Sequence, residues 1–317
     1  MGGKNKEINY DTRVSKTIER KMLAEFFNRL SVFGNIASYR YIGMGSYYFT
    51  DFRLFHRNLG ICDMVSIEWD KDNRSRFKFN NPFKCIDIKF GASWEVTPTL
   101  NWEKRTILWL DYDRHLDNNK LLDVKEFCGN AIAGSVILVT LSAETNDEDN
   151  GEMGKRLEKI KLRVGSSRVP HDVIEQDLRQ WGTAELYRRI IDIYIKQSLN
   201  DRNGGLPQEA RLRYRQLFNF HYSDGGKMVT VGGLIYNDEH TALLDAGIFA
   251  NLDFIRDGAD PYLIEEPTLT YREIRYLDSE LPAQEDEAVS TENIPIADIN
   301  KYRKLYRYFP TFTEASL

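Results

Sequence analysis

Two kinds of hydrophobic pattern alternate along the chain up to about residue 240. Short, nearly continuous apolar runs are typical of strands buried on both faces, whereas apolar residues at every third or fourth position are typical of helices. The runs predict five strands, in chain order YRYIG, MVSIE, FKCIDIKFG, TILWLDYD and SVILVTLSAE. The periodic stretches predict helices at 13–33, 50–60, 116–134 and 183–199, with a polar helix or turn at 70–79.

The pattern changes after the fifth strand. Residues 145–160 are strongly polar and predict a loop that runs into a helix. Residues 217–237 then predict a β-hairpin with its turn at Asp224-Gly225-Gly226. Together these elements predict a Rossmann-like, doubly wound α/β fold, with a mostly parallel seven-stranded sheet and an antiparallel C-terminal hairpin.

The two ends of the chain lie outside this pattern. We expect residues 1–12 to form a flexible arm, and residues 13–240 to form one domain that begins with a capping helix. Residues 241–317 are less periodic, and we expect them to form an extension packed on that domain, with a terminal helix near 297–309.

Charge and composition exclude several functional classes. The chain carries 43 Lys and Arg residues against 48 Asp and Glu residues, so a protein that mainly coats nucleic acid is not expected. No apolar stretch is long enough to span a membrane, and the polar first residues lack a signal core, so we expect a cytoplasmic protein. Cys62, Cys85 and Cys128 are widely spaced and predict no metal site, only reduced, mostly buried thiols.

Candidate chemistry gathers at the ends of the predicted strands, where ligands bind in this class of fold. The first strand ends in Gly43-Met44-Gly45-Ser46, where the backbone can approach a ligand closely. The second strand ends in Glu68, whose carboxylate can accept hydrogen bonds from ribose hydroxyls. The third strand carries Asp87, and the fourth ends in Asp111-Tyr112-Asp113. This ordered series predicts a site for a nucleoside-type ligand.

The first turn distinguishes between nucleoside cofactors. A dinucleotide site requires GxGxxG, but the third glycine position is occupied by Tyr48, which disfavours close passage of a pyrophosphate. S-adenosylmethionine has no pyrophosphate, and the late hairpin is also typical of methyltransferases. Three blocks carry the resemblance: YIGMGSYYFTDFRLFHRNLGI (41–61), MVSIEWDKDNRSRFKFNNPFKCIDIKFGAS (64–93) and TILWLDYDRHLD (106–117). The chain resembles class I S-adenosylmethionine-dependent methyltransferases and, more narrowly, a family of bacterial O-methyltransferases.

This resemblance implies roles for individual residues. The turn glycines would line the methionine part of the cofactor, Glu68 would hold the ribose and Asp87 would lie near the adenine. Asp111 would lie beneath the sulfonium and the acceptor. The implied cofactor-binding set is Gly43, Met44, Gly45, Ser46, Glu68, Trp69, Asp87, Ile88 and Asp111. The chain departs from the family pattern at Tyr41 and Ile42, where an acid is common. It also departs at Tyr47, which occupies the third glycine position of a GxGxG turn.

The reaction expected from this resemblance is direct displacement, in which an acceptor oxygen attacks the methyl group in line. Asp111, Asp113 or His115 would accept the proton of the acceptor. Small metal-dependent O-methyltransferases have a lysine where this chain has Arg114, and arginine is a poor base. A catechol-type mechanism is therefore not expected, although Asp111, Asp113 and Glu144 could still hold a hard cation.

Other charged and polar positions have simpler interpretations. Arg13, Lys16 and Arg20 share one helical face, which either covers the cofactor cleft or is a solvated basic surface, and the solvated surface is favoured. The Asn80–Phe83 segment resembles a catalytic signature of amino-methylating enzymes, but it is better read as the turn into the third strand. His56 and His221 are expected to be structural or exposed.

We therefore predict an S-adenosylmethionine-dependent O-methyltransferase with a small-molecule or protein acceptor. The alternative is a catalytically idle Rossmann-like subunit that binds a nucleotide or a partner protein. A nucleic-acid methyltransferase is a third hypothesis, and it would require basic surface near Asp111. The sequence identifies neither the acceptor nor the oligomeric state.

Overall fold

The strands pair into one sheet in the order β3-β2-β1-β4-β5-β7-β6-β8. We describe this fold from a computed structural model, which covers residues 13–144, 155–223, 225–283, 289 and 291–311. The strands are β1 Arg40–Gly43, β2 Asp63–Glu68, β3 Ile86–Phe90, β4 Thr106–Asp111, β5 Val136–Ser142, β6 Arg213–Ser223, β7 Lys227–Tyr236 and β8 Tyr262–Ile264. All neighbours are parallel except β7, which lies antiparallel between β5 and β6. The predicted doubly wound sheet with its antiparallel hairpin is confirmed.

The sheet has one strand more than the seven expected. The additional strand, β8, pairs parallel to β6, with Tyr262 opposite Phe220. It contains only three residues, which is too short for a repeating pattern of polar and apolar positions. The sequence pattern therefore could not predict this strand at the edge of the sheet.

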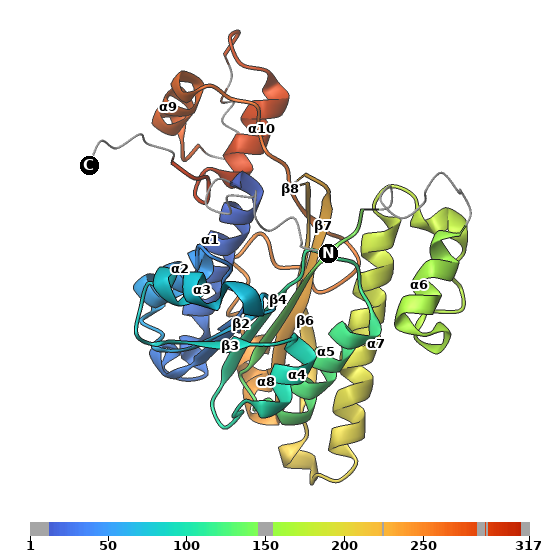
Figure 1. The fold of residues 1–317 in the computed structure, drawn as a ribbon. Coiled ribbons are helices and arrows are strands. Elements are labelled where there is room, and N and C mark those ends of the chain that lie inside the picture. Colours follow the sequence, from blue (N-terminus) through green and yellow to red (C-terminus); the bar gives the residue numbers. More distant parts are fainter. Residues whose placement is uncertain (1–12, 145–154, 224, 284–288, 290, 312–317) are drawn as a thin grey trace.

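Helices cover both faces of the sheet, with α1, α2 and α3 on one face and α5 and α7 on the other (Figure 1). The helices are α1 Val14–Arg29, α2 Thr50–Leu59, α3 Arg74–Asn80, α4 Ser93–Val96, α5 Asn118–Asn130, α6 Arg156–Val164, α7 Gly182–Asn203, α8 Asp238–Asp245, α9 Tyr271–Glu280 and α10 Ile296–Leu305. The predicted helices are confirmed, and α2 ends at Gly60, whose φ of 70° is the left-handed geometry of a glycine stop. Of the predicted polar loop, residues 145–154 lie outside the described residues.

Two hydrophobic cores result, one on each face of the sheet. Tyr41 and Trp109 point into the core shared with α1 and α2. Their chain neighbours Ile42 and Leu110 point into the core shared with α5 and α7. Because both faces are covered, successive strand residues are buried in turn, which is the physical origin of the continuous apolar runs.

The C-terminal extension packs against α1. Glu266 accepts hydrogen bonds from the backbone N–H and the hydroxyl of Ser15, at 2.8 and 2.6 Å. Lys21 donates to the carbonyl oxygen of Phe309 at 2.9 Å. Figure 1 shows α10 beyond the end of α1 and α9 beside α10, and these two helices enclose a small core of their own around Leu277. Among the described residues, none of the helices combines the length and apolarity needed to cross a membrane.

A pair of glycines allows β7 to fit between its neighbours. A β-bulge in β6 shifts the pairing so that Gln216 lies opposite Gly233 and Phe218 opposite Gly232. A Cβ atom on Gly232 would lie 2.1 Å from the carbonyl oxygen of Ile137 in β5. The absence of a side chain therefore permits the β5–β7 pairing, which continues toward the end of the sheet that carries the candidate site.

We expect the Gly232→Ala substitution to lower the free energy of unfolding by roughly 3 kcal/mol, the upper end of the usual cost of overpacking. Gly129→Ala is the matched control, because Gly129 lies in α5 and a Cβ atom there would meet nothing within 4 Å. That control should be neutral or stabilising by up to about 1 kcal/mol. Urea denaturation followed by circular dichroism measures both, and equal losses would contradict the packing argument.

Candidate functional site

The turn after β1 is hydrogen-bonded directly to the end of β2. The backbone N–H of Gly45 lies 3.0 Å from Ser66 Oγ and 3.0 Å from Glu68 Oε1. The Ser66 hydroxyl in turn donates to the same carboxylate oxygen at 2.6 Å. Parallel pairing places Gly43 opposite Ser66, so the two strands reach this edge together. The structure thus joins the predicted glycine turn to the predicted acid.

The turn itself is too tight for a side chain at Gly45. A Cβ atom there would lie 2.6 Å from the Phe49 ring and 2.8 Å from Ser66 Oγ. Ser46 and Phe49 have φ values of 52° and 48°, a left-handed conformation that costs free energy in residues other than glycine. Such strain is typical of functional turns, and this turn places the Gly45 N–H against the end of β2.

Glu68 is buried, with only 6% of its surface exposed. Burial raises the pKa of its carboxyl group to about 8, although hydrogen bonds from Ser66 and Gly45 act in the opposite direction. A large fraction of Glu68 therefore carries a proton near neutral pH. A ligand whose hydroxyl groups donate to this carboxylate would favour its ionised form.

Two indole rings lie beyond Glu68. Trp69 is 71% exposed, and its ring centroid lies 5.9 Å from that of Trp94 in α4. Next to Trp94, Ser93 donates to the fully buried carboxylate of Asp123, which also accepts a hydrogen bond from Tyr112 at 2.6 Å. This network ties α4, the helix that carries Trp94, to the loop after β4 and to α5.

The end of β4 meets a lysine from the N-terminal helix. Lys16 Nζ lies 2.7 Å from Asp111 Oδ1, 2.7 Å from Glu19 Oε2 and 3.2 Å from the Tyr222 hydroxyl. It also lies 4.4 Å from the centroid of the Trp109 ring. With 3% of its surface exposed, Lys16 is a buried cation whose three N–H donors face three acceptors.

The favoured interpretation of Arg13, Lys16 and Arg20 as a solvated basic face is therefore wrong. Lys16 and Arg20 are both buried, and α1 covers the end of the sheet instead. Helical periodicity shows that these residues share a face, but it does not show which acids lie opposite them. That information comes only from the packing of α1 on β4 and β6.

Glu19 extends this network across the sheet. It accepts hydrogen bonds from Tyr222 of β6, at 3.3 Å, and from Thr230 of β7. Thr230 shares a hydrogen bond of 2.8 Å with Thr140 of β5, which accepts another from the Trp109 indole at 3.0 Å. The side chains around Asp111 are therefore positioned by four strands and α1.

A second buried carboxylate is hydrogen-bonded to β1. The Tyr41 hydroxyl donates to Asp51, which lies in the first turn of α2 and is buried. Burial raises the pKa of Asp51, and the Arg20 guanidinium opposes this increase. Asp51 was not among the residues predicted from the sequence, because an acid in the first turn of a helix is common on electrostatic grounds alone.

Some predicted residues lie away from this group. Asp87 lies opposite Val65 rather than near the end of the strand, its side chain is 60% exposed, and it pairs with Lys89 at 2.8 Å. Ile88 packs against the core under α1 and α2, and Met44 packs against the core on the opposite face of the sheet. The structure therefore does not bring Asp87 to Glu68.

The residues after β4 take different positions. Asp113 is exposed. His115 Nδ1 lies 3.0 Å from the carbonyl oxygen of Ser142, at the end of β5. Within the described ranges, Asp111, Asp113 and Glu144 do not converge into a group of three that could hold a cation. The proposed hard-cation site is therefore not formed by these side chains.

The solved structures that match this chain include several methyltransferases. The chain resembles Trm1 from Pyrococcus horikoshii in complex with S-adenosyl-L-methionine, with 9% identity and a TM-score of 0.44 over 73% of this chain and 58% of that chain. It resembles human N-acetylserotonin methyltransferase in complex with SAM, with 10% identity and a TM-score of 0.33 over 69% and 55%. It also resembles an O-methyltransferase family protein from Burkholderia thailandensis, with 10% identity and a TM-score of 0.33 over 69% and 57%. The chain thus spans less than two thirds of each of these proteins.

No curated protein matches the sequence. One family profile does match, over residues 8–317, and its description is "Putative O-methyltransferase". The match includes the glycine turn, Glu68, Asp111 and the helix that carries Lys16. By this match over nearly its whole length, the chain belongs to that O-methyltransferase family.

Proposed function

We propose that this protein transfers the methyl group of S-adenosylmethionine to an oxygen atom of a small-molecule acceptor. The observation that carries the proposal is the contact of Gly45 with Glu68 at the carboxyl ends of β1 and β2. β1 and β2 are neighbours in a doubly wound sheet, and β1 also pairs with β4, where the strand order reverses and such folds bind nucleoside ligands. Membership of the O-methyltransferase family supports oxygen as the acceptor atom.

The donors and surfaces at this edge fit the cofactor. Glu68 would accept hydrogen bonds from the ribose hydroxyls, and the indoles of Trp69 and Trp94 would flank the adenine. The backbone of residues 43–46 and the carboxylate of Asp51 would hold the amino-acid part, whose ammonium needs an anionic partner. Trp94 and Asp51 are additions that the structure suggests, and the exposed Asp87 contributes less than the sequence implied.

S-adenosylmethionine, when bound, supplies a methyl group that is electrophilic because it is attached to a sulfonium. Asp111 lies at the end of β4, where its carboxylate would face this positive centre. Lys16 is a positioning residue, because its ammonium is surrounded by Asp111, Glu19 and Tyr222 and has no lone pair to accept a proton. It fixes the orientation of Asp111.

His115 is the best placed proton acceptor among the three residues predicted from sequence. The Ser142 carbonyl oxygen beside Nδ1 can only accept a hydrogen bond, so the neutral imidazole carries its proton on Nδ1. The lone pair then lies on Nε2, the atom that would take the proton of the acceptor hydroxyl. Asp113 is exposed, so we assign it a secondary role at the entrance.

An idle subunit is less well supported by these contacts. Burying Lys16, Glu19, Asp51 and Glu68 costs free energy, and a subunit without a ligand at this edge gains nothing from that arrangement. Buried charges of this kind are typical of functional sites. The concentration of buried ionisable groups at the carboxyl edge therefore favours an enzyme.

Calorimetry with S-adenosylmethionine tests the cofactor site. We expect Glu68→Gln to weaken binding roughly 10- to 100-fold, the usual effect of losing charge-assisted hydrogen bonds. Asp87→Asn is the matched control, since it removes an exposed carboxylate from the neighbouring strand and should leave affinity within about twofold. Unchanged affinity in Glu68→Gln, or no binding to the unmodified protein, would overturn the proposal.

The raised pKa of Glu68 makes nucleoside binding dependent on pH. The free protein holds a proton on Glu68 below about pH 8, whereas ribose hydroxyls favour the ionised carboxylate. Affinity should therefore rise about tenfold per pH unit between pH 6 and 7 and level off above pH 8. Methylthioadenosine is a suitable probe because it lacks the amino-acid group. A flat profile in the unmodified protein, or the same slope in Glu68→Gln, would contradict this assignment.

Substitution of His115 tests the proton acceptor. We expect His115→Gln to lower kcat by roughly 100-fold or more, the usual contribution of a general base, while the affinity for S-adenosylmethionine is unchanged. Release of adenosylhomocysteine is measured with the low-molecular-weight fraction of a cell extract as the source of acceptor. His171→Gln is the control because His171 is exposed and remote in sequence. Equal rates in both variants would exclude His115 as the base.

A further inference from the structure

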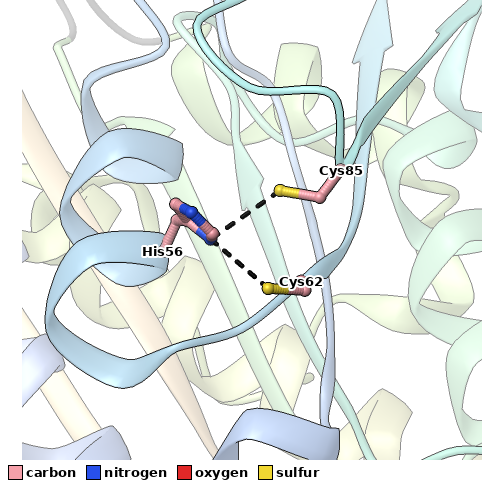
Figure 2. A group of neighbouring side chains, drawn as sticks. All are labelled: His56, Cys62 and Cys85. Carbon is pink, nitrogen blue, oxygen red and sulfur yellow. Dashed lines mark hydrogen bonds between the residues drawn. The ribbon is translucent and has the colours of Figure 1, made fainter.

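Two of the three cysteines lie beside a histidine. The expectation of mostly buried thiols is wrong, because Cys62 is exposed and Cys85 half-buried, and only Cys128 is buried. Figure 2 shows the two thiols pointing toward the imidazole of His56, whose Nδ1 lies 3.7 Å from each sulfur. The three atoms lie within 4.8 Å of one another, and among the described residues no other group of three offers metal ligands in this way.

Three separate elements bring these side chains together. His56 lies in the last turn of α2, Cys62 directly precedes β2, and Cys85 directly precedes β3. The parallel pairing of β2 and β3 places Met64 opposite Ile86, so the segments before both strands lie side by side. The sequence does not predict this cluster, because the cysteines are far apart in the chain and no CxxC spacing links them.

Two contacts position the imidazole. The centroid of the His56 ring lies 4.3 Å from the centroid of the Phe83 ring, and His56 Nδ1 lies 2.8 Å from the carbonyl oxygen of Ile61. Phe83 is positioned by Asn81, which accepts a hydrogen bond from the Phe83 N–H at 3.2 Å and donates to the Ile86 carbonyl at 3.0 Å. The Asn80–Phe83 segment is therefore a structural turn, as predicted, and it supports the His56 ring.

The spacing matches that of a thiolate and imidazole metal site. Zinc lies about 2.3 Å from cysteine sulfur and about 2.0 Å from histidine nitrogen, so a tetrahedral angle separates the two ligand atoms by about 3.5 Å. The observed separations are 3.7 Å to both sulfurs. We propose that His56, Cys62 and Cys85 bind a thiophilic divalent ion of the zinc class, with solvent as the fourth ligand on the exposed side of Cys62.

Binding requires a defined transfer of protons. The two thiols lose their protons to solvent and bind as thiolates. The imidazole stays neutral because its proton moves from Nδ1 to Nε2, and the Ile61 carbonyl gives up its hydrogen bond from Nδ1. No oxidant or reductant is involved, so the site is distinct from a disulfide switch.

The ion would act far from the methyl-transfer site. Cys62 precedes Glu68 by six residues along β2, which corresponds to about 20 Å of extended chain. The cluster lies at the amino ends of the strands, whereas the cofactor edge lies at their carboxyl ends. Its effect would be to join the end of α2 to the starts of β2 and β3, and hence to stabilise the fold.

Cobalt titration of the reduced, full-length protein tests this site. We expect one equivalent of Co²⁺ to produce a thiolate-to-cobalt charge-transfer band and tetrahedral visible bands, and Zn²⁺ to displace the cobalt. Cys62→Ser and Cys85→Ser should each weaken binding by at least about tenfold and reduce the charge-transfer intensity. Cys128→Ser is the matched control and should retain both.

Two results would overturn the proposal: the absence of a saturable charge-transfer band in the unmodified protein, or the same band in a variant that lacks both Cys62 and Cys85. Thermal denaturation provides a second readout, since Zn²⁺ should raise the Tm of the unmodified protein and of Cys128→Ser but not that of Cys85→Ser. Binding of S-adenosylmethionine should be the same with and without Zn²⁺, so this test is independent of the proposed methyl transfer.

Discussion

The ion pair between Lys16 and Asp111 is the interaction on which the candidate site depends. It joins the N-terminal helix to the end of β4, and both partners are largely removed from water. A buried charge is tolerated only when it is matched by opposite charge and hydrogen bonds. Glu19 and Tyr222 supply that match, so the helix, β4 and β6 must all be in place before the site exists.

The C-terminal extension contributes to the same arrangement. Glu266 accepts hydrogen bonds from the first turn of α1, where backbone N–H groups would otherwise lack partners. A carboxylate is also favourable at this end of the helix dipole. A residue 251 positions away in the chain thus stabilises the start of the helix that carries Lys16. The extension and the site are coupled through α1, although they are distant in sequence.

The two ends of the sheet carry different chemistry for a common geometric reason. In a parallel sheet, all carboxyl ends meet at one edge and all amino ends at the other. Glu68, Asp111 and the glycine turn lie at the carboxyl ends of the strands, and Cys62 and Cys85 lie at the amino ends. The two groups of side chains therefore lie at opposite ends of the same paired strands.

Much of the fold followed from local pattern, because strands buried on both faces and amphipathic helices leave a periodic signal in neighbouring residues. Glu68 and Asp111 were also identifiable as candidates, since they are the last residues of such strands. The tertiary structure alone decided the partners of Lys16, the contact of Asp51 with Tyr41, the approach of Cys62 and Cys85 to His56, and the place of the short strand β8. Each of these depends on packing between segments that are separated along the chain. The sequence around a charged residue, a thiol or a three-residue strand does not show which distant segment will pack against it.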